Sequence, residues 1–172
     1  MSSKISKYPG TEITPDDVKA GRYLTTLYQA DLKYAWTSGV ATSRYLKGLK
    51  EGKIWGRRCD RCERVMVPPR MYCERCYRPT DAWVRLLDTG KVVTYSIAYV
   101  NFDASRRKEP ILVAVVEIEG ASPLMGILHL LGEVAPEKVK IGMRVQAVWK
   151  PAKERTGAIT DISYFKPLGG KR

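Results

Sequence analysis

The chain has 172 residues, of which 44% are hydrophobic and 28% charged, as in a soluble globular protein and unlike a disordered segment. This length allows one ordinary domain or two small ones, and two small ones fit the pattern better. No apolar run approaches the roughly 20 residues that span a bilayer. The opening MSSKISKYPG also lacks the apolar core of a secretory signal, so we expect a cytoplasmic protein.

The net charge of +12, from 30 Lys and Arg against 18 Asp and Glu, indicates a polyanionic partner. That partner can be nucleic acid, a phosphorylated cofactor or an acidic protein, and a basic surface that serves only solubility is the alternative. The excess is uneven, because positions 44–78 hold eleven basic and four acidic residues. We therefore expect the partner to meet this end of the protein.

Residues 1–42 are predicted to form an N-terminal helical arm after a flexible lead of thirteen residues. Thr14 supplies a capping hydroxyl, Pro15 suits the first helical position, and two acids follow near the positive helix end. The helix should run from about Pro15 to Trp36. Its apolar stripe consists of Val18, Gly21, Leu24, Tyr28, Leu32 and Ala35. Whether this stripe packs on the chain's own barrel or on a partner protein stays open.

Residues 43–82 are predicted to hold a short helix and a metal-binding ribbon. The helix should cover Thr42 to Glu51, with Tyr45, Leu46 and Leu49 on one side, and end at Gly52. The following segment, Ile54 to Val84, is dominated by cysteine, arginine, proline and aromatic residues and has no helical period. This composition is typical of a metal ribbon.

The four cysteines form two close pairs, Cys59 with Cys62 and Cys73 with Cys76, in the pattern C-x2-C-x10-C-x2-C. Two intervening residues let a tight turn aim both thiolates at one ion, and two such knuckles complete a tetrahedral shell. Such a shell has no open position, so the spacing predicts a structural zinc ion that does not activate water. Iron in the same shell, four free thiols or a redox disulfide are the alternatives.

Two further features surround this site. Glu63 and Tyr77 occupy the position after each pair, where many knuckles use glycine. A divalent ion with four thiolates carries a formal charge of −2, which nearby arginines would partly offset. These arginines are Arg57, Arg58, Arg61, Arg64, Arg70, Arg75 and Arg78.

Residues 83–167 are predicted to form a five-stranded barrel, followed by a basic tail at 168–172. The expected strands are Lys91 to Val100, Ile111 to Glu119, Leu124 to Leu131, Arg144 to Lys150 and Ala158 to Lys166. One helical turn fits residues 135–140, between the third and fourth strands. Three strands, a short helix and two strands is the order of the OB-fold, and a five-stranded open sheet is the main competitor.

The barrel sequence argues against catalysis and against a broad phosphate track. Glu117 and Glu119 share an outer strand face, whereas the cations of this half cluster in the loop Arg106-Arg107-Lys108. His129 is the single histidine and lies in an apolar strand, so we interpret it as structural. No phosphate loop, carboxylate-pair motif or nucleophile elbow occurs, so we expect no catalytic residues and no enzyme activity in isolation.

Several motifs together resemble the domain-of-unknown-function family number thirty-five, across about Tyr45 to Pro167. They occur in the family's order and are YLKGLKEGKI (45–54), RCDRC (58–62), PPR (68–70), CERC (73–76), GKVVTYS (90–96), PILVAVVE (110–117) and IGMRV (141–145). The resemblance implies a rubredoxin-like zinc ribbon followed by an OB-fold. The metal ligands that it carries over are the four cysteines, and Glu63 departs from the family's commoner glycine.

The resemblance also implies a function with acyl-CoA. Members are similar to non-catalytic subunits that bridge thiolase or hydroxymethylglutaryl-CoA synthase enzymes and hold or channel the CoA thioester. Coenzyme A is polyanionic, so basic residues suit it. We expect Arg106, Arg107 and Lys108 to contact its phosphates, with Arg57 and Arg58 behind them. A single-stranded nucleic-acid-binding module, or a scaffold that binds only protein through the arm, is the alternative.

Overall fold

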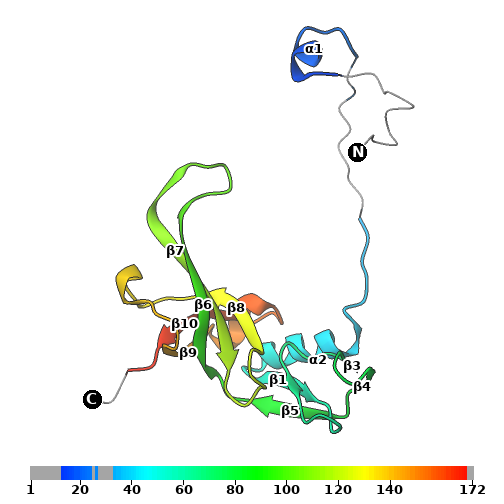
Figure 1. Cartoon of the computed structure of the whole chain (residues 1–172), viewed down its shortest axis with the longest axis vertical. Coiled ribbons are helices and arrows are strands. Elements are labelled where there is room, and N and C mark those ends of the chain that lie inside the picture. Colours follow the sequence, from blue (N-terminus) through cyan, green and yellow to red (C-terminus); the bar gives the residue numbers. More distant parts are fainter. Residues whose placement is uncertain (1–12, 25, 27–32, 170–172) are drawn as a thin grey trace, which may run out of the picture. The chain divides into compact units, whose positions relative to one another are not determined.

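The computed structural model describes residues 13–24, 26 and 33–169 and divides into two units, 1–36 and 37–172. Each unit is considered by itself (Figure 1). Throughout the described ranges, no helix has the length and apolar character needed to cross a membrane.

The first unit contains α1 (Pro15–Lys19), which begins as the sequence predicts. The Thr14 hydroxyl accepts a hydrogen bond from the Asp17 amide at 3.3 Å, and the Asp17 carboxylate accepts one from the Thr14 amide at 3.0 Å. The predicted continuation to Trp36 is wrong for residues 20–24, 26 and 33–36, none of which is helical. The cause is local: Gly21 takes a left-handed φ of 66°, which ends the helix. Tyr28 and Leu32 lie outside the described residues.

The second unit begins with α2 (Gly39–Lys50), the predicted short helix, which starts three residues earlier than expected. It buries Ala41, Tyr45, Gly48 and Leu49, all on one face. A Cβ atom at Gly48 would collide with the Trp55 side chain, so glycine lets the helix approach the first strand closely.

The metal-binding ribbon follows α2 and consists of two small antiparallel sheets. The larger has the strand order β2-β1-β5, and the smaller pairs β3 with β4. The bounds are β1 (Ile54–Arg58), β2 (Val65–Met66), β3 (Tyr72–Cys73), β4 (Arg78–Pro79) and β5 (Ala82–Leu86).

The remainder of the chain forms a five-stranded antiparallel sheet with the order β10-β9-β6-β7-β8. Its strands are β6 (Thr89–Val100), β7 (Arg106–Ile118), β8 (Gly126–Leu130), β9 (Arg144–Trp149) and β10 (Ile162–Pro167). Short 3-10 turns are η2 (Pro136–Lys138), η3 (Ala152–Glu154) and η4 (Ile159–Asp161). The order of three strands, a helical turn and two strands is confirmed.

The sheet closes on itself, which decides for a barrel over an open sheet. Leu131, directly after β8, makes a parallel bridge with Phe165 of β10, and the Gly132 amide donates to the Phe165 carbonyl at 3.0 Å. Two strand boundaries differ from the prediction by four residues or more. Arg106 to Lys108 belong to β7 and not to a loop, because β6 and β7 continue as a projecting hairpin (Figure 1). The fifth strand begins at Ile162, after η4.

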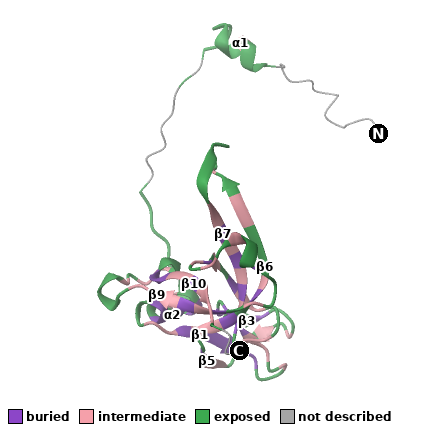
Figure 2. Ribbon diagram, turned by 90° about the vertical axis from the view of Figure 1, so that its left-hand side faces the viewer, coloured by how far each residue is buried: buried purple, intermediate pink, exposed green. Residues whose placement is uncertain are grey.

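Ribbon and barrel share one apolar core and do not have two separate cores. Leu49 of α2, Ile54 and Leu86 of the ribbon sheet, and Val92 and Phe165 of the barrel belong to the same buried cluster. A smaller cluster around the cysteines contains Met66. Figure 2 shows buried residues along the ribbon and barrel strands, whereas the far end of the β6–β7 hairpin is exposed.

Candidate metal centre and ligand surfaces

The four cysteine side chains converge, as their spacing predicts. Their Sγ atoms all lie within 4.8 Å of one another, and the Sγ atoms of Cys62 and Cys73 are 3.7 Å apart. A tetrahedral zinc with Zn–S bonds of about 2.3 Å requires sulfur atoms about 3.8 Å apart, so the donor set and its size fit zinc. Because all four ligands are thiolates, the ion would hold the fold together and leave no coordination position for water.

The two knuckles end in an unusual backbone conformation. Glu63 and Tyr77, each directly after the second cysteine of its pair, have φ values of 58° and 51°. This left-handed region favours glycine, because a Cβ atom crowds the following carbonyl oxygen. The knuckle geometry therefore dictates the conformation even where the sequence departs from glycine.

The surroundings shift the pKa values of two of the cysteine thiols in opposite directions. Hydrogen bonds from the backbone amides of Cys62 and Arg61, opposed by burial, lower the pKa of Cys59 to about 7. Burial raises the pKa of Cys76 to about 12. A metal ion would replace the proton on Cys76, because coordination stabilises the thiolate.

Most of the arginines near the metal centre already have carboxylate partners. Arg58 pairs with Asp60 at 2.7 Å, and Arg78 with Asp81 at 2.9 Å. Glu74 lies 3.2 Å from Arg64 and 4.0 Å from Arg70. Within the described part of the chain, Arg61 and Arg75 make no ion pair, and each sits between the cysteines of one knuckle.

Of the predicted phosphate contacts, Arg57 and Arg58 lie on β1, away from the others. Arg57 is 6% exposed and donates hydrogen bonds to the Thr80 hydroxyl at 2.9 Å and to the Thr80 carbonyl. Its guanidinium also lies 4.8 Å from the Trp83 ring centre. Arg57 thus joins β1 to the turn before β5, and its donors face protein groups.

Arg106, Arg107 and Lys108 line a hollow of about 390 Å³ that Asn101 and Glu109 complete. The hairpin pairing runs from Ala98 opposite Ile111 directly to Val100 opposite Arg106, so residues 107–110 bulge from β7. Arg107 donates to the Asn101 side-chain oxygen and, at 3.2 Å, to the Glu109 carbonyl. Three adjacent cations therefore lie at this bulge, and hydrogen bonds hold the guanidinium group of Arg107 in one orientation.

The outer barrel face carries the acids that the strand pattern predicts. Glu117 pairs with Lys91 at 2.9 Å and accepts the Leu124 amide at 2.7 Å. The amide of Leu124, and then the Lys91 ammonium, lower the pKa of the Glu117 carboxyl. Glu119 pairs with Arg144 at 3.1 Å. A phosphate track across this face is unfavourable, because both carboxylates stay ionised there.

Both ring nitrogens of His129, which the sequence predicts to be a structural residue, make hydrogen bonds within the protein. Its Nδ1 accepts the Leu130 amide at 2.9 Å, so Nε2 carries the proton and donates to the Ile159 carbonyl at 3.2 Å. The ring also packs edge-on against Phe165. With both nitrogens engaged, the imidazole ties β8 to η4.

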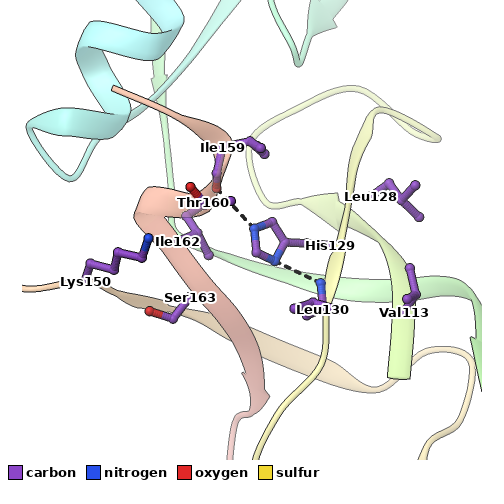
Figure 3. Close-up of a pocket in the computed structure, with 9 residues that line it drawn as sticks. All are labelled: Val113, Leu128, His129, Leu130, Lys150, Ile159, Thr160, Ile162 and Ser163. Atoms are coloured by element: carbon purple, nitrogen blue, oxygen red, sulfur yellow. Dashed lines mark hydrogen bonds between the residues drawn. The ribbon is translucent and has the colours of Figure 1, made fainter. Parts of the chain in front are cut away.

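An apolar hollow beside His129, which we call the edge pocket, was not predicted. It has a volume of about 490 Å³ (Figure 3). Its lining residues are Val113, Leu128, His129, Leu130, Lys150, Ile159, Thr160, Ile162 and Ser163. The sequence signal was the outward-facing pair Leu128 and Leu130, but the other wall comes from residues about thirty positions later.

Two family models match the chain. One describes the rubredoxin-like zinc ribbon domain of ChsH2 and matches residues 46–81, and the other describes the C-terminal OB-fold domain of ChsH2 and matches residues 83–150. Their order agrees with the ribbon and barrel described above, although the second model begins within β5 and ends before β10.

Individual proteins give the same result. A "DUF35 domain-containing scaffold protein" of Methanocaldococcus jannaschii is 35% identical over 66% of this chain and 80% of its own length. A "Probable enoyl-CoA hydratase alpha subunit" of Thermomonospora curvata is 29% identical over 63% of this chain, but only 33% of that protein. The solved structure "Ltp2-ChsH2(DUF35) aldolase" covers 78% of this chain at 24% identity with a TM-score of 0.55, which supports the fold.

Four observations agree on the family: the converging cysteines, the closed barrel, the two matching models and the relative that is 35% identical. This chain belongs to the DUF35 family, in which a zinc ribbon precedes an OB-fold domain.

Proposed function

We propose that this protein is a non-catalytic, acyl-CoA-binding scaffold subunit of a thiolase-type or hydroxymethylglutaryl-CoA synthase-type complex, in which it holds or channels the CoA thioester. The names of its relatives support this proposal: one is a scaffold protein, one a hydratase subunit, and one a DUF35 protein in an aldolase structure. The cytoplasmic location stays a prediction from the sequence.

The observation that carries the proposal is the basic hollow on the β6–β7 hairpin. Three cations line one small depression there, and the bulge fixes the Arg107 guanidinium against Asn101. The phosphates of CoA are the expected ligands, because arginine donors bind phosphate oxygens in a planar, charge-assisted arrangement. We assign Arg106, Arg107 and Lys108 to these phosphates. Arg57, with Arg58 beside it, would instead keep the ribbon sheet rigid.

We assign the first unit to the enzyme partner. Helix α1 buries none of its residues, and Leu24 and Trp36 are 103% and 81% exposed. We expect these exposed apolar side chains to be buried against that partner. This leaves the ribbon and barrel free to present the thioester.

A charge-matched pair of variants tests CoA binding. Arg106→Ala with Lys108→Ala should weaken the binding of CoA and acetyl-CoA by about tenfold in isothermal titration, since each lost contact is a charge-assisted one. Lys138→Ala with Lys140→Ala removes the same charge from exposed positions around η2 and should leave the affinity unchanged. Equal losses in both variants, or no CoA binding by the parent protein, would refute the phosphate assignment.

Co-purification tests the scaffold assignment separately. The protein, affinity-tagged in its native host, should retain a thiolase-like or synthase-like enzyme, and a chain lacking residues 1–36 should not. Retention of the enzyme by the truncated chain would show that the arm is not the contact.

Tight binding of a short DNA or RNA strand at physiological salt would favour the nucleic-acid alternative. The affinity for such a strand should fall steeply with added salt.

A further inference from the structure

The edge pocket lies where the barrel is least closed. β8 is the last strand of the sheet order, and Leu131 makes its single bridge to β10, just beyond the strand. Over Gly126–Leu130, the side of β8 that faces away from β7 therefore pairs with no strand among the described residues. An edge of this kind offers free backbone donors and acceptors to another chain.

The hydrogen-bond register identifies which groups are free. Antiparallel partners alternate between hydrogen-bonded and non-bonded pairs. The Leu131 amide donates to the Leu112 carbonyl of β7 at 2.9 Å, whereas the Leu130 amide points the other way and is capped by His129. By the same alternation, the amide and carbonyl groups of Leu128 and Gly126 point away from β7. His129 thus covers one end of the edge and leaves the other available.

The side chains around this free edge are mostly apolar. Leu128 is 66% exposed, Leu130 44% and Ile159 39%, although all three line one hollow. In the view of Figure 3, Lys150 and Ser163 lie across the His129 ring from Leu128 and Val113. Such a surface suits an extended peptide. The backbone of the peptide pairs with the free edge of the strand, and every second side chain of the peptide enters an apolar pocket.

Lys150 restricts the ligand further. It is the one lysine or arginine among the residues that line the edge pocket, and no described carboxylate lies within 4.0 Å of its ammonium group. A single cation in an apolar hollow suits one carboxylate. It does not suit a nucleic-acid strand, which carries a charge at every phosphate and needs a basic track.

We propose that the free edge of β8 binds an extended segment of a partner protein by strand addition, with apolar side chains in the edge pocket and one acidic side chain at Lys150. The proposal rests on the scaffold role only in that the segment would come from the partner enzyme. It needs neither CoA nor the basic hollow, so the two can fail independently.

Peptide display tests the proposal without a known partner. The full chain, loaded with zinc, is used to select from a library of random ten-residue peptides, and the enriched sequences are synthesised. They should alternate apolar and polar residues and contain an aspartate or glutamate. Methylation of one backbone amide of such a peptide should weaken its affinity by about tenfold, because one edge hydrogen bond is lost and the methyl group blocks close pairing.

Variants locate the site. Leu128→Pro removes the outward amide donor at a position where an edge strand tolerates proline, and should abolish peptide binding while the melting temperature stays near that of the parent. Leu128→Glu, which alters only an exposed side chain, serves the same purpose if the proline variant does not fold. Lys150→Ala should remove the preference for acidic peptides. Ile141→Lys replaces an apolar side chain of similar exposure, 68%, outside the pocket and should change nothing.

The outcomes separate the possibilities. Chemical-shift changes at Gly126, Leu128 and Ile159 on addition of a selected peptide would support strand addition. The proposal is overturned if selected peptides bind the Leu128 variants as tightly as the parent, if amide methylation has no effect, or if an oligonucleotide displaces the peptide from these residues.

Discussion

At the residue scale, the knuckle positions show how a local sequence departure is absorbed. Glu63 and Tyr77 hold a glycine-like conformation because each directly follows the second cysteine of a knuckle, where the backbone turns to bring the sulfur atoms together. The cysteine spacing alone was enough to predict this site, since a C-x2-C turn is a local structure. The sequence also showed that glycine is absent from both positions, but not which backbone conformation they take.

Replacing these residues with glycine should stabilise the protein. Glu63→Gly and Tyr77→Gly should each raise the free energy of unfolding by about 1 kcal/mol, because the left-handed conformation costs a non-glycine residue about that much. Urea denaturation of the zinc-loaded protein measures the change. The matched variants Glu63→Ala and Tyr77→Ala keep the Cβ atom and should show no gain. A gain in the alanine variants would mean that the side chains, and not the backbone, are unfavourable.

Asp161 provides a pH-dependent test at the same scale. Burial alone would raise its pKa, but the amides of Thr156, Gly157 and Ala158 donate to its carboxylate at 2.9, 2.7 and 3.2 Å and lower the pKa below the usual value. A group with a lowered folded-state pKa stabilises the fold above its ordinary pKa, and this contribution disappears as the pH falls through the lowered value.

Asp161→Asn should therefore destabilise the protein by about 1–3 kcal/mol at pH 7, since one buried amide loses its acceptor. The difference from the parent should stay constant down to about pH 4, the ordinary aspartate pKa, and narrow only below it. Urea denaturation of both proteins across this range, with zinc content checked at each pH, measures the difference. A gap that narrows already between pH 7 and 5 would contradict the lowered pKa.

At the element scale, α2 is attached to the ribbon sheet by stacked aromatic and cationic side chains. The Arg44 guanidinium lies 4.7 Å from the ring centre of Trp55 and 4.6 Å from that of Trp83, so it is held between two indole rings. Arg57 lies over Trp83 as well. Helix spacing predicted α2 but not the stacking of Arg44 between the two rings, since contacts between a helix and two later strands leave no local pattern.

Arg44→Ala should lower the free energy of unfolding by about 1 kcal/mol, the size of a cation–π contact at an exposed site. Lys47→Ala, one turn further along the same exposed face, should have little effect. Thermal unfolding of the two variants provides the comparison. If both lose the same stability, the rings contribute no specific attraction, and general charge on α2 is responsible.

Other elements show where sequence patterns stop being informative. The N-terminal helix was overextended because apolar spacing was weighed above Gly21, whose position ends the helix after five residues. The strands of the barrel were found within a few residues because their apolar alternation is local. The extension of β7 through Arg106 was missed, because polar residues on an exposed hairpin carry no alternating signal and pair only through β6.

At the scale of the whole molecule, the metal and the shared core depend on each other. The ribbon sheet places Ile54 and Leu86 into the same cluster as Val92 and Phe165, while its knuckles bury little besides Met66 and the cysteines. Metal binding supplies on the order of 10–16 kcal/mol in zinc-finger peptides. A metal ion on the four cysteines would therefore stabilise the knuckles, while the rest of the ribbon is stabilised by packing on the barrel.

Removal of the metal should unfold the ribbon before the barrel. After dialysis against a chelator, residues 59–78 should lose amide-exchange protection, while β6 to β10 stay protected but with a lower melting temperature. Elemental analysis should find about one zinc per chain before treatment and almost none afterwards. An unchanged exchange pattern in metal-free protein would show that the thiols alone hold the knuckles, and iron in the analysis would correct the metal.

The shared core has a practical meaning for anyone who dissects this protein. Cutting the chain between Leu86 and Val92 would expose apolar core residues on both fragments. We therefore expect neither fragment to fold as an independent domain. The same continuity joins the ribbon sheet to the base of the β6–β7 hairpin through one buried cluster. Two partners bound to the ribbon and to the hairpin would therefore be linked through the buried core of this subunit.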